Sequence, residues 1–230
     1  MPLRVELPPT LRDRLAAADR PLIGLWACAG SPITAEIVAG SGCDWVLLDA
    51  EHSPNGLESV LAQLYAMSAY PVAPLVRPPY GDTVTIKQFL DLGAQNLLIP
   101  MVDSAEQAAE IVRAFRYPDG AGGGARGVGS ALARSARWNR VDGYLGRANE
   151  TISLTVQIEP PAAVADVERI PAVDGGDASP LLLSARGLRD GPVSGVDVEV
   201  LDLRDGLSGR RVDDGVAHDC SFEGTAPAGD

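Results

Sequence analysis

Several apolar runs in this chain end abruptly in side chains that could do chemistry. One run ends at Asp49, with Glu51 and His52 directly after it, and two others end at Arg77 and Glu159. A guanidinium can bind an anion, an imidazole can move a proton, and carboxylates can orient either group or hold a metal ion. Because parallel α/β proteins bind ligands at the carboxyl ends of their strands, these residues are predicted to form one site from distant segments. The alternative is that they are solvated strand ends without a common role.

The elements that must position these residues alternate between strand-like and helix-like apolar periodicity. The predicted strands cover Pro21–Ala29, Trp45–Leu48, Val72–Val76, Leu97–Val102 and Ser153–Glu159. The predicted helices cover Thr10–Ala18, Ser31–Ala39, Leu57–Ala69, Asp82–Leu92 and Ser104–Phe115. Regular alternation of this kind is typical of βα units in a parallel sheet, and continuous apolar strands favour a sheet that is covered on both sides or closed into a barrel.

A glycine-rich stretch between Tyr117 and Ser130 interrupts this alternation. It lacks the lysine of a phosphate-binding P-loop and the spacing of a dinucleotide fingerprint, so it is predicted to be a flexible loop. The next segment, Ala131–Arg140, is predicted to be a helix. It is interpreted either as an arginine-rich recognition helix or as a surface helix that closes over the site or packs on a neighbouring subunit.

The composition excludes several classes of protein. The chain has 230 residues, 46% of them apolar, and a net charge of −12, which would repel nucleic acid over most of the surface. No apolar run is long enough to span a membrane and no signal-peptide pattern opens the chain, so a cytoplasmic protein without membrane contact is expected. Lys87 is the only lysine, so any Schiff-base chemistry would have to use it.

The pattern changes near residue 174. Residues 1–173 are predicted to be a βα-repeat portion that carries the site. Residues 174–230 contain ten glycines, twelve acidic residues and little apolar periodicity. They are predicted to be an atypical acidic, glycine-rich segment that either belongs to the same domain or is partly disordered.

Many separate motifs in the first part resemble one known family. They are Gly24-Leu-Trp26, Asp44-Trp-Val-Leu-Leu-Asp-Ala-Glu-His-Ser-Pro-Asn55, Val76-Arg-Pro78, Ile86-Lys-Gln88, Leu98-Ile-Pro-Met-Val102, Arg126-Gly-Val-Gly-Ser-Ala-Leu-Ala-Arg134, Arg137-Trp-Asn-Arg140 and Val156-Gln-Ile-Glu159. Together, over roughly residues 10–173, they resemble the HpcH/HpaI family of class II pyruvate-dependent aldolases. The resemblance implies a (β/α)₈ TIM-type barrel. It also implies a homo-oligomer, a hexamer in the family, and a small 2-oxo acid as substrate.

The resemblance also implies an activity. A 4-hydroxy-2-oxo acid, such as 4-hydroxy-2-oxoheptanedioate, would be cleaved to pyruvate and an aldehyde through an enolate stabilised by a divalent cation (Mg²⁺, Mn²⁺ or Co²⁺). Glu159 would be a metal ligand, with Gln157 close by to contact the substrate. Arg77 would bind the keto oxygen and carboxylate of the substrate.

Two further roles follow from the same resemblance. His52, oriented by Asp49, would be the general base that works on the substrate hydroxyl. Trp26 would line the aldehyde end of the pocket, although a strand tryptophan is more often part of the core. Glu51 is interpreted as structural, on the alternate side of the chain.

The chain departs from the family pattern after residue 173. The family has a second metal-binding aspartate at about the position of Ala185, and Asp190 lies a few residues late. The barrel is therefore predicted to be incomplete or altered in its C-terminal third, through a shifted reading frame or a recombined end. Two interpretations stay open: a metal-dependent aldolase, or an inert remnant that still binds pyruvate-type acids. An acyl-CoA lyase relative is disfavoured because no basic cluster suits a nucleotide phosphate.

Overall fold

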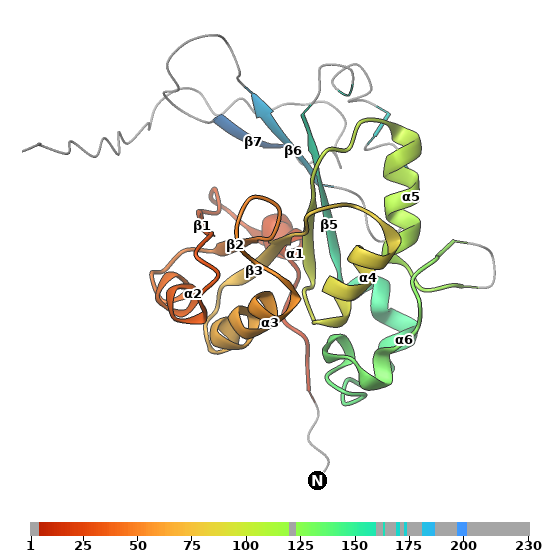
Figure 1. Ribbon diagram of the computed structural model, residues 1–230, viewed down its shortest axis with the longest axis horizontal. Coiled ribbons are helices and arrows are strands. Elements are labelled where there is room, and N and C mark those ends of the chain that lie inside the picture. The colour runs from red at the N-terminus through yellow and green to blue at the C-terminus, as the bar shows by residue number, and fades with distance from the viewer. Residues whose placement is uncertain are drawn as a thin grey trace, which may run out of the picture.

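The computed structural model describes residues 5–119, 123–159, 163, 169, 170 and 173, together with the backbone of residues 181–186 and 197–201. Helices and strands alternate through most of the chain (Figure 1). The elements are α1 (Leu11–Ala17), β1 (Gly24–Ala27), α2 (Pro32–Ala39), β2 (Trp45–Asp49), α3 (Leu57–Ala66), η1 (Met67–Ala69), β3 (Ala73–Arg77), α4 (Thr83–Asp91), β4 (Asn96–Ile99), α5 (Ala105–Phe115), η2 (Ser130–Leu132), η3 (Arg134–Ala136), α6 (Tyr144–Arg147), η4 (Ala148–Thr151), β5 (Ser153–Ile158), β6 (Leu181–Arg186) and β7 (Asp197–Leu201). Within these ranges no helix is both long and apolar enough to cross a membrane.

The strands form one sheet in the order β1-β2-β3-β4-β5-β6-β7. Neighbours are parallel from β1 to β6, which confirms the prediction of a parallel α/β sheet. β7 runs antiparallel to β6, so this pair departs from the all-parallel pattern of a complete barrel. The connection between them covers residues 187–196. It is shorter than the dozen or so residues that a parallel crossover needs, so an antiparallel return is the available geometry.

Local sequence signals start the helices that cover the sheet. The side chain of Ser31 accepts the backbone N–H of Thr34, and Pro32 occupies the first helical position of α2. Asp82 and Ser104 act in the same way at the starts of α4 and α5. These N-caps satisfy backbone donors that have no partner within the helix.

The two faces of the sheet are packed differently. The larger apolar cluster joins one face to the helices α2 to α5, which lie along that side of the sheet in Figure 1. A smaller cluster occupies the other face and contains Leu47, Leu75 and Leu98, with Leu11 from α1. Since side chains alternate along a strand, Asp49 lies on the same face as Leu47. The strand ends that carry polar groups therefore lie above the smaller cluster.

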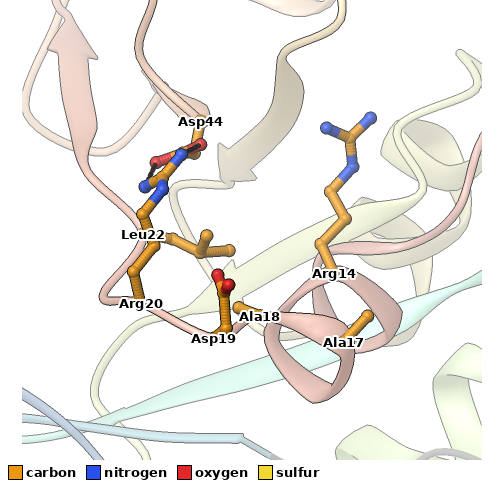
Figure 2. A pocket seen from close by; sticks show the side chains of 7 residues that line it. All are labelled: Arg14, Ala17, Ala18, Asp19, Arg20, Leu22 and Asp44. Carbon is orange, nitrogen blue, oxygen red and sulfur yellow. Dashed lines mark hydrogen bonds and ion pairs between the residues drawn. The ribbon is translucent and has the colours of Figure 1, made fainter.

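Helix α1 lies at the opposite, amino-terminal end of the strands. The backbone N–H of Leu11 donates to the side chain of Asn96 over 2.7 Å, which ties the start of α1 to the start of β4. Beside α1 is a pocket of about 320 Å³ (Figure 2). Arg20 pairs with Asp44 on one side of this pocket, at 2.7 and 2.8 Å, and Arg14 lies on the other. The pocket is remote from the polar strand ends, because Asp44 precedes β2 whereas Asp49 ends it.

The predicted helix over Ala131–Arg140 is wrong. The segment forms two short 3₁₀ turns, η2 and η3, followed by three residues in the left-handed region, Arg137, Trp138 and Asn139. Arg134 is buried and donates to the carbonyl oxygens of Leu92 and Leu64, near the ends of α4 and α3. Its side chain therefore satisfies carbonyls at helix C-termini, a contact that a regular exposed helix would not make.

Candidate active site

The centre of the candidate site is an aligned pair of residues on neighbouring strands. Asp49 ends β2, Arg77 ends β3, and the two are direct partners in the parallel register. Both are buried, at 2% and 5% exposure. Arg77 donates from Nε to Oδ1 of Asp49 and from Nη2 to Oδ2, each over 2.9 Å. This bidentate geometry holds the guanidinium plane in one orientation.

Asp49 also receives backbone donors from the turn that follows it. Oδ1 accepts the N–H groups of Glu51 and His52 at 3.1 and 3.4 Å, and Oδ2 accepts the Ser53 hydroxyl at 3.2 Å. Burial alone would raise the pKa of the Asp49 carboxyl, but the hydrogen bonds from Arg77 and from the backbone outweigh it and hold the pKa below its ordinary value. Asp49 is therefore an ionised anchor for Arg77.

The same turn brings Glu51 back to the site. Its Oε2 lies 3.1 Å from Nε of Arg77, and its side chain is only 15% exposed. The interpretation of Glu51 as a residue on the alternate side of the chain is therefore wrong. Asp49 and Glu51 are two residues apart, a spacing that places side chains on one face of a strand, so this signal was present in the sequence. Glu51 lies beyond the end of β2, but its side chain still points to the same side as that of Asp49.

His52 lies at the rim of this cluster, with its side chain 74% exposed. Its Nε2 is 3.7 Å from Oε1 of Glu51, whereas Asp49 contacts it through the backbone N–H. The predicted orientation of the imidazole by Asp49 is thus replaced in this structure by proximity to Glu51.

Gln157 and Trp26 complete the surroundings of Arg77. Gln157, in β5, is buried, and its Oε1 accepts from Nη1 of Arg77 over 3.3 Å. Trp26, in β1, places its ring centroid 4.7 Å from Cζ of Arg77 and is 45% exposed. A cation over an indole face is attracted by the ring quadrupole. The structure therefore brings four predicted residues, Asp49, Arg77, Gln157 and Trp26, into one cluster.

Glu159 follows directly after β5 and is exposed. It is two residues beyond Gln157, so it continues the same face of the strand. In the part of the chain that the structure describes, no group of three or more His, Cys, Asp and Glu side chains could hold a metal ion. Among the described residues, Glu159 is therefore a lone candidate ligand, which on its own does not make a complete divalent-cation site. Ala185 lies in β6 and has no donor side chain, and Asp190 lies outside the described residues.

The fold and the polar strand ends define a barrel-type α/β protein with a site at the carboxyl edge of its sheet. Residues 22–184 match the HpcH/HpaI aldolase/citrate lyase family, and the chain belongs to this family. HpcH/HpaI aldolases generally depend on a divalent metal ion.

Named relatives and solved structures support this assignment. The chain is 54% identical over 180 residues to a hydroxypyruvate/pyruvate aldolase of Deinococcus radiodurans, which covers 77% of this chain and 64% of the relative. It is 51% identical over 160 residues to a 4-hydroxy-2-oxo-heptane-1,7-dioate aldolase of Escherichia coli, which covers 70% of this chain and 60% of the relative. The chain therefore matches less than two thirds of the length of these relatives.

A family member from Burkholderia cenocepacia superimposes with a TM-score of 0.68 at 38% identity, over 72% of this chain and 65% of the other. An HpcH/HpaI aldolase from Desulfitobacterium hafniense gives a TM-score of 0.64 at 30% identity, over 73% of this chain and 64% of the other.

Proposed function

We propose that this chain is a metal-dependent aldolase that cleaves a 4-hydroxy-2-oxo acid to pyruvate and an aldehyde. The names of its relatives support the reaction class. The observation that carries the proposal for this chain is the setting of Arg77, a buried guanidinium fixed on three sides at the carboxyl edge of the sheet.

The hydrogen-bond donors of Arg77 suit a 2-oxo acid. A guanidinium has five N–H groups. The contacts with Asp49, Glu51 and Gln157 use the Nε–H and one N–H on each terminal nitrogen. One N–H on each of Nη1 and Nη2 has no partner among the described residues. Donors on both terminal nitrogens can bind two oxygens of a carboxylate, or a carboxylate oxygen and the adjacent keto oxygen.

The cleavage step needs a proton acceptor and a stabilised enolate. When the C3–C4 bond breaks, its electron pair moves into the pyruvate unit and forms the enolate, while the C4 hydroxyl loses its proton and becomes the aldehyde. Arg77 would present a fixed positive charge to the enolate oxygen, where the negative charge develops. His52 would accept the hydroxyl proton. A divalent cation held by Glu159 would supply Lewis-acid stabilisation of the same oxygen.

The imine route of aldol cleavage needs a lysine side chain that forms a Schiff base with the substrate. Lys87 is the only lysine in the sequence, and it lies within α4, on the helix side of the sheet. A Schiff-base lysine must lie beside the reacting carbonyl in a desolvated place. We therefore assign the enolate route.

Pyruvate release tests the proposal directly. The full chain would be incubated with 4-hydroxy-2-oxoheptanedioate, and pyruvate would be followed by its reduction with lactate dehydrogenase. We expect release in the presence of Mn²⁺ or Mg²⁺ and loss of it after chelation. Full activity after exhaustive chelation, or pyruvate trapped on Lys87 by borohydride, would contradict the proposed route.

A second candidate is an inert relative that binds pyruvate-type acids without cleaving them. The observation that favours it is that the described residues contain no group of three or more side chains that could hold a metal ion. The same assay separates the candidates when it is combined with calorimetric titration of pyruvate, because binding without pyruvate release supports the inert relative.

A further inference from the structure

A buried glutamine in α3 stands where packing alone would favour an apolar residue. Gln63 is 0% exposed, and its helix neighbours Val60 and Leu64 belong to the apolar cluster between the sheet and the helices. The Oε1 atom of Gln63 has no hydrogen-bond partner among the described residues. A buried amide with an unpartnered acceptor lowers stability, and proteins keep such groups mainly where they have another role. The contacts of the amide nitrogen therefore indicate why a glutamine is present.

The nitrogen of Gln63 connects α3 to the turn that follows β2. Its Nε2 donates to Oδ1 of Asn55 over 2.7 Å, and Nδ2 of Asn55 donates to the backbone carbonyl of Asp49 over 2.6 Å. The Ser59 hydroxyl donates to the same oxygen of Asn55 over 3.0 Å. A backbone carbonyl can only accept, so the Asn55 amide has to present its nitrogen to Asp49 and its oxygen to Gln63. The two amides thus form a chain of hydrogen bonds with one fixed direction.

The peptide group between Asp49 and Ala50 is held from both sides. Its carbonyl oxygen accepts from Asn55, and its N–H donates to the carbonyl oxygen of Arg77 over 2.8 Å. This peptide sets the direction in which the chain leaves β2, and with it the direction of the next N–H groups, which donate to the Asp49 carboxylate. The orientation of this one peptide therefore determines where His52 lies relative to Arg77.

Helix capping does not explain the contacts of Asn55. The N-cap of α3 is Gly56, which makes no side-chain cap hydrogen bond, and the amide nitrogen of Asn55 donates to Asp49 and not to the carboxyl side of the chain. Asn55 also lies close to the turn after β1, because a Cβ atom at Gly30 would be 3.4 Å from its Oδ1. Gly30 has a φ of +65°, which favours glycine. Asn55 therefore packs between two turns at the carboxyl edge of the sheet, where the candidate site lies.

We propose that Asn55 and Gln63 are positioning residues for the candidate active site. The catalytic part of the inference rests on the proposed function, in which His52 accepts a proton from a substrate held by Arg77. The amide chain keeps the turn, and with it the imidazole, in place, and neither amide touches the reacting atoms. Without the chain the turn should move while the guanidinium keeps its side-chain partners. Binding and cleavage should therefore respond differently.

Two variants interrupt the chain at different points. Asn55→Ala removes both links, and Gln63→Met removes the link to α3 while an apolar side chain of similar volume fills the same place. The matched control is Gln88→Met, the same change at an exposed position of α4. Amide hydrogen exchange, measured by NMR on the full chain, would follow the N–H groups of Ala50 and Glu51, whose own acceptors neither variant removes. The N–H groups inside β2 and β3 serve as the internal reference.

In Asn55→Ala we expect the N–H groups of Ala50 and Glu51 to exchange about tenfold faster than in the parent, the order expected from losing one buried hydrogen bond. The reference N–H groups should keep their rates. The kcat for pyruvate release should fall by about 10- to 100-fold, the cost of a small misplacement, while the dissociation constant of pyruvate changes by less than about twofold. Circular dichroism would verify that the variant is folded.

Gln63→Met should show the same changes more weakly, because Ser59 still donates to Asn55. Its urea midpoint should be no lower than that of the parent, since the unpartnered buried acceptor is gone. A purely structural role predicts the opposite, a lower midpoint with unchanged exchange in the turn. Gln88→Met should behave like the parent. If Asn55→Ala does not fold, Gln63→Met carries the test alone.

Unchanged exchange of Ala50 and Glu51 in both variants, or an equal increase throughout the sheet, would overturn the inference. Faster exchange confined to the turn, with kcat equal to that of the parent, would overturn its catalytic part. A parent that neither binds pyruvate nor releases it would reject the proposed function instead. The exchange rates would then still decide whether the two amides hold the turn, because they need no substrate.

Discussion

At the scale of single residues, the function proposed here depends on how Arg77 is held. The sequence predicts that Asp49 and Arg77 meet, because each lies at the end of a strand of a parallel sheet, and the family resemblance adds Gln157. The structure brings both Asp49 and Gln157 within hydrogen-bond distance of Arg77. The resemblance predicts that Asp49 orients His52, whereas in the structure the nearest carboxylate oxygen to the imidazole belongs to Glu51. That detail depends on the turn after β2, where the Asp49 carboxylate accepts the backbone N–H groups of Glu51 and His52.

Replacing Arg77 by lysine should keep the positive charge and remove the planar pair of N–H donors. A lysine ammonium is a point charge without the planar pair of donors, so it loses both the bidentate bond to Asp49 and the matched pair for the substrate. We expect kcat/KM for pyruvate release to fall by about 10²- to 10³-fold, the usual cost of one preorganised donor. Arg147→Lys is the control, since the Arg147 side chain is 58% exposed and pairs with Glu150 in an exposed ion pair. Equal kinetics for the two variants would refute the role of Arg77.

Removing the imidazole of His52 should slow the cleavage reaction. The expected loss for His52→Ala is about 10²- to 10⁴-fold in kcat, the usual share of a general base. Pyruvate binding should change little, because the two free donors belong to Arg77. Steady-state kinetics together with calorimetric titration of pyruvate would separate the two effects. Cleavage at the parent rate would show that another group accepts the proton.

At the scale of elements, the helices and strands before β5 follow from apolar periodicity and capping residues. The structure of Ala131–Arg140, after the glycine-rich loop, does not follow from these signals, because its arginines suggest the exposed surface of a helix. Arg134 is instead buried, and burial, together with repulsion from Arg137, lowers its pKa to about 10. Its partners, the carbonyls of Leu64 and Leu92, lie at 70 and 42 residues' separation. Contacts over such distances in the chain are not contained in local periodicity.

Arg134 should therefore stabilise the packing of α3 and α4. We expect Arg134→Met to lower the free energy of unfolding by about 2 kcal/mol, because the carbonyls of Leu64 and Leu92 lose a charged donor. Arg140→Met is the matched control, since Arg140 is exposed and lies over the Trp138 ring at 5.8 Å. Urea denaturation followed by circular dichroism gives both values. Equal unfolding midpoints for the two variants would contradict the stabilising role of Arg134.

At the scale of the whole molecule, the parallel sheet and its two packed faces are predictable from the sequence, and the C-terminal part is not. The order of β1 to β5 follows from repeated βα units, each with a connection long enough for a parallel crossover. After β5 the periodicity fades, and the direction of β7 depends on a short connection rather than on an apolar pattern. The second metal-binding carboxylate of the family pattern belongs to this part of the chain.

The whole chain should bind its metal ion weakly. A hard cation would be held by Glu159 and water alone, because alanine stands at position 185, where the family pattern has a second carboxylate. The number of charged ligands sets the affinity of such a site. We expect Mn²⁺ to bind with a dissociation constant of about 10⁻⁴ to 10⁻³ M, the range of weak oxygen sites. Binding should be lost in Glu159→Gln and kept in Glu58→Gln. Tight stoichiometric binding in calorimetry would show that Asp190 or another carboxylate after residue 174 completes the site.

Exchange of the methyl protons of pyruvate in deuterated water tests the central claim most directly. This half-reaction forms the enolate without an aldehyde partner, so it depends on Arg77 and the cation and not on the aldehyde end of the pocket. Proton NMR should show exchange by the parent chain above the buffer rate, dependent on Mn²⁺. Exchange should be lost in Arg77→Met and kept in Arg147→Met. Exchange no faster than in buffer, or an equal rate in Arg77→Met, would contradict the claim that this cluster stabilises a pyruvate enolate.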